Sequence, residues 1–312
     1  MGNKKEMNMT EGKTLATGLR FPEGPVVLAD GSVLVVEIER ATLTRIRAGG
    51  GQEVVAFMGG APNGAAIGPD GACYVCNSGG FKWHEEPGML RPIGQSEHYT
   101  GGSIQRVDLK SGAVTTLYGG GSGPQLKGPN DLVFDAAGGF WFTDQGKTRE
   151  RSIDRASVYY AQPDGSALKE VIFPMLGANG VGLSADGSRL YVAETATARL
   201  WEFTLTAPGV IDPEPWPSPN GGRLLTGSSN YQLFDSLALE RDGNICVATL
   251  INGGITVVAP GGRVLEHVAL PDQYATNLCF GGPDMRTAYI TLSTTGRLIA
   301  MQWPRPGLPL NF

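Results

Sequence analysis

One pattern occurs six times along this chain: a polar residue opens a short apolar segment, a turn follows, and a second short apolar segment comes after the turn. The copies begin at Phe21, Pro62, Pro129, Asn179, Phe234 and Thr276. Consecutive copies are on the order of 40 to 70 residues apart, and a repeat of roughly 40–50 residues that holds four short strands is typical of a propeller blade. The repeat therefore predicts an all-β protein, a six-bladed β-propeller with four-stranded blades.

The sequence between the copies supplies the other two strands of each blade. SIQRVDL (Ser103 to Leu109) and AVTTLY (Ala113 to Tyr118) follow the second copy, and ARLWEFTL (Ala198 to Leu205) and GRLLTG (Gly222 to Gly227) follow the fourth. These runs are short, rich in β-branched or aromatic residues and bounded by turn residues, and we find no sustained helical periodicity. Because no blade can bury its faces alone, we expect one propeller domain over residues 13–312, preceded by a mobile tail at 1–12.

Charge and composition exclude several classes of partner. The net charge of −5 argues against binding to nucleic acid or to an acidic membrane surface. No apolar run is long enough to span a bilayer, and the N-terminal MGNKKEMNMTEGK lacks the apolar segment of a secretory signal. We therefore expect a cytoplasmic protein with no nucleic-acid or membrane partner.

The cysteines invite a metal or redox interpretation, because Cys73 and Cys76 form a C-x-x-C motif. Side chains three residues apart on an extended strand point to opposite faces. We therefore interpret these two residues, with Cys246 and Cys279, as buried free thiols.

Six polar side chains stand at the start of the six first strands. In a propeller the first strand of each blade lines the central channel, so these side chains should meet at one end of it, called here the upper mouth. These six residues, called here the ring, are Glu23, Asn63, Asn130, Asn179, Asp235 and Asn277. A simpler interpretation stays open, most of all for Asn63 and Asn277: an Asn or Asp at a strand entrance can be a turn residue.

The chemistry of these six side chains points to a hard cation. Carboxylates and amide oxygens, with no histidine or cysteine at a ring position, suit calcium best, and magnesium or manganese is possible. Zinc fits less well, because it prefers nitrogen and sulfur ligands. The predicted metal ligands are Glu23, Asn130, Asn179 and Asp235.

A long connection lies on the same side as the upper mouth. It runs from Ser78 to Gly102 in the second blade and is rich in aromatic and polar residues. Long connections in compact domains are usually functional, so we interpret this one as a lid or wall of a substrate site. The predicted substrate-binding residues are Trp83, His84, Asn63, Asn130 and Asn277.

The motifs FPEGP, GPND, NGVGLSADGSRLYVAET, FDSLALERDGNICVAT and TNLCFGGPDMRTAYIT together resemble the senescence-marker-protein-30/gluconolactonase family, also called regucalcin-like. The resemblance runs from about Gly18 to Trp303. It implies a six-bladed propeller that holds one divalent metal, usually calcium, on Glu23, Asn179 and Asp235. Asn130 would be a fourth ligand or a substrate contact.

The resemblance also implies an activity, the hydrolysis of sugar lactones. The metal would polarise the lactone carbonyl, and a carboxylate would activate water. By resemblance that base is Asp235, although a metal-bound carboxylate is a weakened base. Asp131 is the alternative, but adjacent side chains on a strand point opposite ways, so Asp131 would face away from the channel. One departure is Gly128, which stands where animal members have an Arg that contacts the sugar, so their specificity does not transfer.

Other functions remain open at this point. The same ring suits a phosphotriesterase-like hydrolase, since related six-bladed calcium enzymes hydrolyse organophosphates. A non-enzymatic binding module with a structural metal is another alternative, and a strictosidine-synthase-like condensing enzyme is disfavoured by the acidic ring. The expected partner is a small-molecule lactone or ester. The tail from Trp303 to Phe312 is expected to pack where the first and last blades meet.

Overall fold

The computed structural model describes residues 12–119 and 125–312. Of the segment expected as a tail, residues 1–12, all but Gly12 therefore lies outside the described residues. The described part of the chain contains strands and no helix, which confirms the all-β prediction. No helix that could cross a membrane occurs in these residues.

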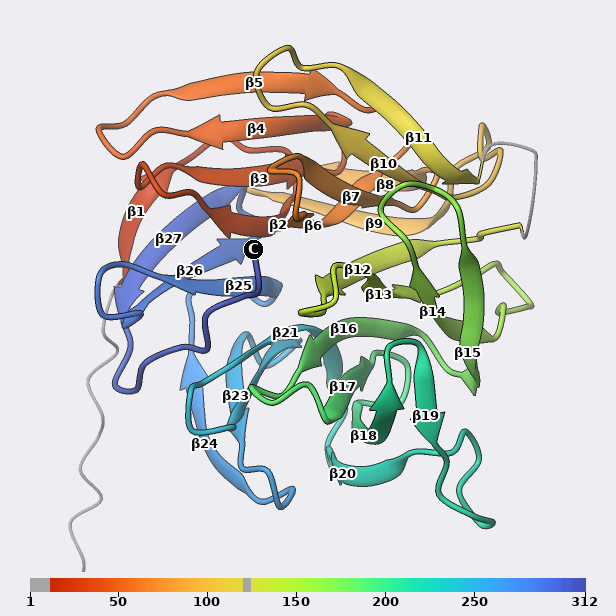
Figure 1. The fold of residues 1–312 in the computed structure, drawn as a ribbon. Coiled ribbons are helices and arrows are strands. Elements are labelled where there is room, and N and C mark those ends of the chain that lie inside the picture. Colours follow the sequence, from red (N-terminus) through yellow and green to blue (C-terminus); the bar gives the residue numbers. More distant parts are fainter. Residues whose placement is uncertain (1–11, 120–124) are drawn as a thin grey trace, which may run out of the picture.

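Six sheets are arranged around a central axis, and the innermost strand of each lines that axis (Figure 1). Each innermost strand packs against the innermost strand of the next blade, and the sixth packs against the first, so the ring is closed. This confirms a six-bladed propeller. The innermost strands are β2 (Pro22–Val27), β6 (Pro62–Ile67), β12 (Pro129–Phe134), β16 (Ala178–Leu183), β21 (Leu233–Leu239) and β25 (Ala275–Gly281).

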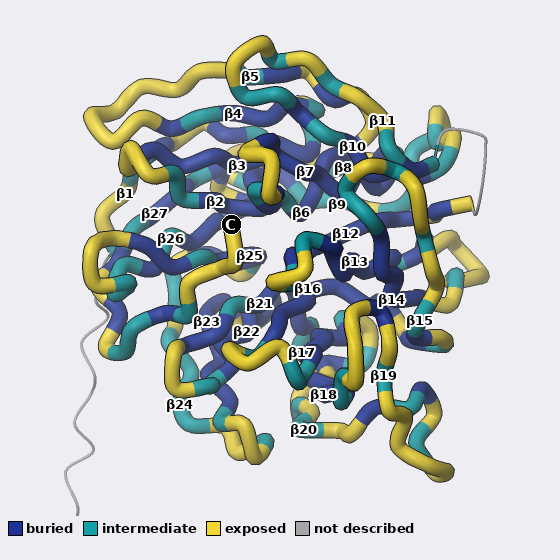
Figure 2. Tube along the Cα trace, in the orientation of Figure 1, coloured by how far each residue is buried: buried dark blue, intermediate teal, exposed yellow. Residues whose placement is uncertain are grey.

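The second strands are the most deeply buried, because they lie between the axis and the outer strands and are covered by both neighbouring blades (Figure 2). They are β3 (Val33–Glu37), β7 (Cys73–Asn77), β13 (Phe140–Asp144), β17 (Arg189–Glu194), β22 (Ile245–Leu250) and β26 (Thr287–Leu292). Next come β4 (Thr42–Ile46), β10 (Ser103–Val107), β14 (Ala156–Ala161), β18 (Arg199–Ala207), β23 (Gly254–Val258) and β27 (Arg297–Gln302).

The outer strands consist mostly of exposed and half-buried residues. They are β5 (Gln52–Phe57), β11 (Val114–Gly119), β15 (Leu168–Met175), β20 (Arg223–Gly227), β24 (Val264–Ala269) and β1 (Lys13–Ala16). The fourth blade departs from the four-stranded prediction, because β18 pairs with both β20 and the short β19 (Val210–Asp212). The other five blades have four strands each.

The ring is closed by the N-terminal strand. β1 pairs antiparallel with β27, so the sixth blade combines the first and last strands of the chain. The tail after β27 does not take this place, and its expected position was wrong. It runs beneath the fifth blade, where Leu308 N donates to Leu239 O (2.8 Å), and reaches the third, where Asn311 Nδ2 donates to Phe134 O (2.8 Å). The C-terminal end lies over the middle of the ring in Figure 1.

The connection from Ser78 to Gly102 contains a β-hairpin that was not predicted from the sequence. Its strands β8 (Phe81–Glu86) and β9 (Met89–Gln95) form a separate two-stranded sheet. They are joined by Pro87-Gly88, with Gly88 at a φ of 80°. This Pro-Gly pair is a turn signal that the sequence already contained.

The C-x-x-C motif does not form a site. Cys73 and Cys76 lie on the same strand, β7, but in different hydrophobic clusters, one on each face of the blade. Both are buried and free, and burial raises the pKa of both thiols. The interpretation as buried free thiols is confirmed for them.

Candidate active site

Each innermost strand carries a β-bulge at its predicted site residue. In β12, for example, Pro129 pairs with Asp144 and Leu132 with Phe142, so the inner strand has one residue more than its partner. The other five inner strands show the same irregularity at their entrances. A bulge interrupts the alternation of side chains and re-aims them. Asn130 and Asp131 can therefore both reach the channel, and the expectation that Asp131 faces away was wrong.

The glycines that follow the site residues are explained by close packing between blades. A Cβ on Gly64 would lie 2.6 Å from Asn130 O, and one on Gly180 would lie 2.7 Å from Ser236 Cα. Neither glycine has a positive φ. Asn63 and Asn179 are therefore strand residues, and the turn interpretation does not hold for them. Asn277 also lies within a strand, β25.

The six ring residues are all buried, each at most 9% exposed. Burial raises the pKa of the Glu23 carboxyl, and the side chains of Thr276 and Asn277 oppose this shift. Burial and the charge of Glu23 raise the pKa of Asp235, while Asn179 opposes that shift. Two carboxylates more than 200 residues apart in sequence therefore act on each other across the ring.

Two amide oxygens in the ring have no hydrogen-bond partner among the described residues. The amide group of Asn130 donates to Gln145 Oε1 (3.3 Å), and that of Asn179 donates to Thr195 Oγ1 (3.1 Å). The Oδ1 atoms of both residues are left buried and unpaired. Such atoms are costly to bury unless a bound group satisfies them. Together with Glu23 and Asp235 they make an oxygen-only donor set that fits a hard cation.

No cluster of three or more His, Cys, Asp or Glu side chains with metal-binding geometry occurs in residues 12–119 and 125–312. The fit to a cation therefore depends on the amide oxygens as much as on the carboxylates. It does not extend to ions that need sulfur or nitrogen ligands, because no histidine or cysteine belongs to the ring.

Asp131 and Asp235 differ in the direction they face. Asp131 and Asn277 border a cavity of about 630 Å³ that lies below the ring, and Glu23 and Asp235 do not. Burial, followed by the charge of Glu23, raises the pKa of Asp131 to about 7. Burial is the main cause that raises the pKa of Tyr274, and the charge of Asp235 adds to this shift. Tyr274 lies just before β25 and packs against the cluster that contains Phe21 and Leu90 of the hairpin. Asp235 therefore lies toward the upper mouth.

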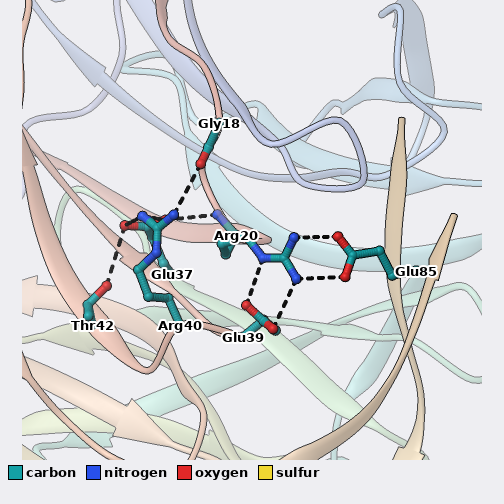
Figure 3. Close-up of polar contacts among 7 residues, drawn as sticks. All are labelled: Gly18, Arg20, Glu37, Glu39, Arg40, Thr42 and Glu85. Atoms are coloured by element: carbon teal, nitrogen blue, oxygen red, sulfur yellow. Dashed lines mark hydrogen bonds and ion pairs between the residues drawn. The ribbon is translucent and has the colours of Figure 1, made fainter. Parts of the chain in front are cut away.

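The hairpin is fixed across the tops of the first and sixth blades. Figure 3 shows Arg20 held between Glu39 (2.8 Å) and Glu85 of β8 (3.0 Å). On the other strand, Leu90 N donates to Thr294 O (3.0 Å) in the sixth blade. These contacts hold the hairpin at the upper mouth, which is where the lid interpretation requires it.

The predicted substrate contacts on the hairpin have different surroundings. Trp83 is half-buried and its ring lies 5.3 Å from that of Phe21, two residues before Glu23. Phe21 has a φ of 56°, a strained conformation for a bulky residue, and Trp83 supports it. The His84 side chain is 44% exposed and lies opposite Arg91 in the hairpin pairing.

Lys147 belongs to the same region and was not singled out as a site residue. Its side chain is 3% exposed, and its amine lies 4.3 Å from the centre of the Phe81 ring and 5.1 Å from that of Tyr99. Burial lowers its pKa to about 8. The aromatic faces favour the charged amine and tie the base of the hairpin to the third blade. No local sequence signal marks this lysine, because its partners come from another blade.

The departure at Gly128 also has a structural reason. A Cβ at this position would lie 2.5 Å from Gly146 O. Gly128 N donates to the buried Asp144 Oδ1 at 2.6 Å. The close approach leaves no room for an arginine side chain on this backbone.

The profile of the family described as SMP-30/Gluconolactonase/LRE-like region matches residues 21–294. Lactonase drp35 of Staphylococcus haemolyticus is 34% identical over 143 residues, which are 46% of this chain and 42% of that protein. The match therefore spans less than half the length of that relative. A gluconolactonase of Zymomonas mobilis is 24% identical over 300 residues, covering 86% of this chain and 75% of the relative.

Among solved structures, a calcium-binding protein, regucalcin, from Agrobacterium tumefaciens shares the fold. Its TM-score is 0.74 at 17% sequence identity, and the match covers 96% of this chain and 98% of that one. At this identity the likeness concerns the propeller alone.

Proposed function

Because this chain belongs to the SMP-30/gluconolactonase/LRE-like family, we propose that it is a metal-dependent hydrolase that opens a lactone ring at the upper mouth of its channel. The observation that carries the proposal is the buried ring in which the carboxylates of Glu23 and Asp235 accompany the unpaired Oδ1 atoms of Asn130 and Asn179. Relatives named lactonase and gluconolactonase support the choice of reaction.

The four ring residues Glu23, Asn130, Asn179 and Asp235 would hold one divalent cation, with calcium the best fit to carboxylate and amide oxygens. When bound, such an ion polarises the lactone carbonyl and stabilises the negative charge that develops on its oxygen. The two buried carboxylates balance its charge, which removes the electrostatic cost of burying both of them.

We assign the role of general base to Asp235 rather than Asp131. Asp235 lies on the side of the ring that the hairpin covers, whereas Asp131 borders the lower cavity. In the proposed reaction Asp235 takes a proton from water as the water oxygen bonds to the carbonyl carbon. The ring C–O bond then breaks, and the proton passes to the departing alkoxide, giving a hydroxy acid.

The remaining polar residues have supporting roles in this proposal. Asn63 stands in β6, next to the first blade, and remains a candidate for the substrate hydroxyl or ring oxygen. Asn277 acts on Glu23 and borders the lower cavity. We assign to Asn277 the role of orienting Glu23. His84, which is on the exposed face of the hairpin, remains a candidate for direct contact with the substrate.

The test is hydrolysis of a panel of γ- and δ-lactones by the protein treated with a chelator, with calcium or manganese added back. Turnover should return with the cation and be absent in Glu23→Gln. Asp242→Asn, a neutralised carboxylate at an exposed turn, is the matched control and should behave as the unaltered protein. Hydrolysis of a phosphotriester without any lactone turnover would favour the phosphotriesterase alternative. Cation binding by calorimetry without hydrolysis of either would favour a binding module.

A further inference from the structure

We propose that Arg91, on strand β9 of the hairpin, binds an anionic group of the substrate, so that this site selects lactones that carry a carboxylate. The inference rests on the proposed function, whose substrate class it narrows. Four observations carry it: where Arg91 is held, what its guanidinium lacks, which groups it acts on, and the charge of the site around it.

Arg91 is held at the upper mouth by its neighbour. Leu90 is 6% exposed, and its backbone N–H donates to Thr294 O of the sixth blade at 3.0 Å. The facing strand is tied to the first blade through Glu85 and Arg20 (Figure 3). The backbone of Arg91 is therefore fixed at two sides, and its side chain starts from a rigid element rather than a loose loop.

The guanidinium of Arg91 differs from the other cations of this region. Arg20 is paired with Glu39 and Glu85, and Lys127 and Arg149 are paired with Asp154. In the described part of the chain, the side chain of Arg91 makes no hydrogen bond or ion pair with another residue, although the residue is half-buried. A partly desolvated guanidinium without a partner gains most from a planar anion, which it can bind through two parallel hydrogen bonds.

Arg91 and the proposed base act on the same side chain. Tyr274 is half-buried, and burial is the main reason that its pKa is raised. The charge of Arg91 opposes this shift, while Tyr231 and Asp235 add to it. Tyr274 packs against the cluster that contains Leu90, the residue before Arg91, and its ring lies 6.4 Å from that of Phe21, two residues before Glu23. The tyrosine therefore stands near both the hairpin and the polar ring. A small molecule whose anionic group meets Arg91 would have its remaining atoms directed toward Asp235 and the ring.

The charge of the site explains why such a residue would decide specificity. The chain has a net charge of −5, and the ring contributes the carboxylates of Glu23 and Asp235, which one divalent cation only balances. An anionic lactone would meet no net attraction at such a mouth without an additional cation. Arg91 supplies that cation at the entrance, where it is not already used by a carboxylate of the protein.

The experiment uses two lactones with the same five-membered ring and the same reacting carbonyl. One is γ-valerolactone, with a methyl group on the ring carbon next to the ring oxygen, and the other carries a carboxylate there. The unaltered, calcium-loaded protein should prefer the carboxylate form by about 10-fold or more in kcat/KM, as a charge-assisted pair implies. Arg91→Gln should lower kcat/KM for the carboxylate lactone by about 10- to 100-fold, chiefly by raising KM. The neutral lactone should be turned over within about twofold of the unaltered protein.

Arg91→Lys should restore part of the preference, because it keeps the charge and loses the bidentate geometry. Arg263→Gln is the matched control. It removes one positive charge from an exposed turn between β23 and β24, and it should change neither substrate. Equal turnover of both lactones by the unaltered protein would overturn the inference, as would an equal loss on both in Arg91→Gln, which indicates a structural role. In either case the proposed function would stand.

If no lactone is hydrolysed in the presence of calcium or manganese, the proposed function itself is wrong. The role of Arg91 has a readout that does not need turnover, the calorimetric binding of 2-hydroxyglutarate, which is the ring-opened form of the carboxylate lactone. Binding that Arg91→Gln abolishes and Arg263→Gln leaves unchanged supports the anion site. Binding that is the same in all three proteins, or absent from the unaltered one, overturns it.

Discussion

The two ends of the central channel are built by the same six strands and have opposite character. At the upper mouth the strands begin with buried carboxylates and amides, and a polar hairpin crosses them. A few residues further along, the same strands present Val26, Val133, Leu183 and Leu239 to the cavity of about 630 Å³, which the C-terminal tail borders. The bulge at each strand entrance separates the two regions. The candidate site residues are confined to the irregular part of each strand, and the regular ladder below it supplies the scaffold.

The two ends should also differ in what they contribute to folding. Buried carboxylates with raised pKa values destabilise the metal-free fold, while apolar side chains in the lower channel stabilise it. The proposed function therefore predicts that activity and stability depend on different parts of the same strands. Substitutions at the upper end should change activity at little cost in stability, and those at the lower end should do the reverse.

The largest effect is expected at the upper end. Asp235→Asn and Glu23→Gln should each lower kcat for a lactone by about 1,000-fold or more, because each removes a ligand charge and Asp235 is also the proposed base. Steady-state kinetics with saturating calcium measure this. The free energy of unfolding of the metal-free variants should be equal to or higher than that of the parent, since a buried charge has been removed. A large loss of stability with normal kcat would show that these residues are structural.

At the lower end, Leu239→Ala should do the opposite. Leu239 is 6% exposed, and truncation of a buried leucine costs about 2–4 kcal/mol of unfolding free energy. Turnover measured below the new melting temperature should stay within about threefold of the parent, because the ring above is unchanged. Urea unfolding and kinetics on the same preparation decide the matter. A kcat reduced to the level of Asp235→Asn would mean that the two ends are coupled.

The sequence was sufficient to predict which residues line the upper mouth, but not how the surrounding segments are arranged. The position of Glu23, Asn179 and Asp235 at the entrances of inner strands could be predicted, because the repeat fixes which residue opens each of these strands. The bulges could not be predicted, since an extra residue is defined by the register with the neighbouring strand and leaves no trace in a period of two. Asp131 was therefore given the wrong direction.

The surroundings of the ring depend on contacts between blades. The hairpin had a local signal in Pro87-Gly88, but its position over the first and sixth blades follows from pairs such as Arg20 and Glu85. Lys147 and the path of the tail have no local signal, because their partners lie in other blades. Such contacts become visible only when the ring is assembled.

The pH dependence of stability should also distinguish the two ends of the channel. Burial raises the pKa values of Glu23 and Asp235 in the ring and raises that of Asp131 below it to about 7. The metal-free fold therefore keeps protons that the unfolded chain releases at about pH 4, and its unfolding free energy should fall as pH rises. A bound cation requires the deprotonated carboxylates. The increase in melting temperature that calcium produces should therefore be larger at pH 8 than at pH 5, which differential scanning calorimetry can measure.

Leu239→Ala should keep this pH dependence, and Glu23→Gln should weaken it. An equal calcium shift at pH 5 and pH 8 would contradict the assignment of the cation to the buried carboxylates. A calcium effect of the same size in Glu23→Gln would place the ion elsewhere in the molecule.

The smallest effect is expected from the tail, which borders the lower cavity as the hairpin covers the upper mouth. Three contacts hold residues 308–312. Leu308 N donates a hydrogen bond to Leu239 O, Asn311 Nδ2 donates one to Phe134 O, and the Phe312 ring lies 6.0 Å from that of Phe134. Leu310 and Phe312 remain partly exposed, so removing the segment should cost about 1–2 kcal/mol and lower the melting temperature by a few degrees. The values of kcat and KM should change less than about twofold, since no tail residue reaches the ring. A tenfold loss of activity at unchanged stability would mean that water or ions entering from below reach Asp131 and Glu23, and the upper mouth would then not be the only functional end of the channel.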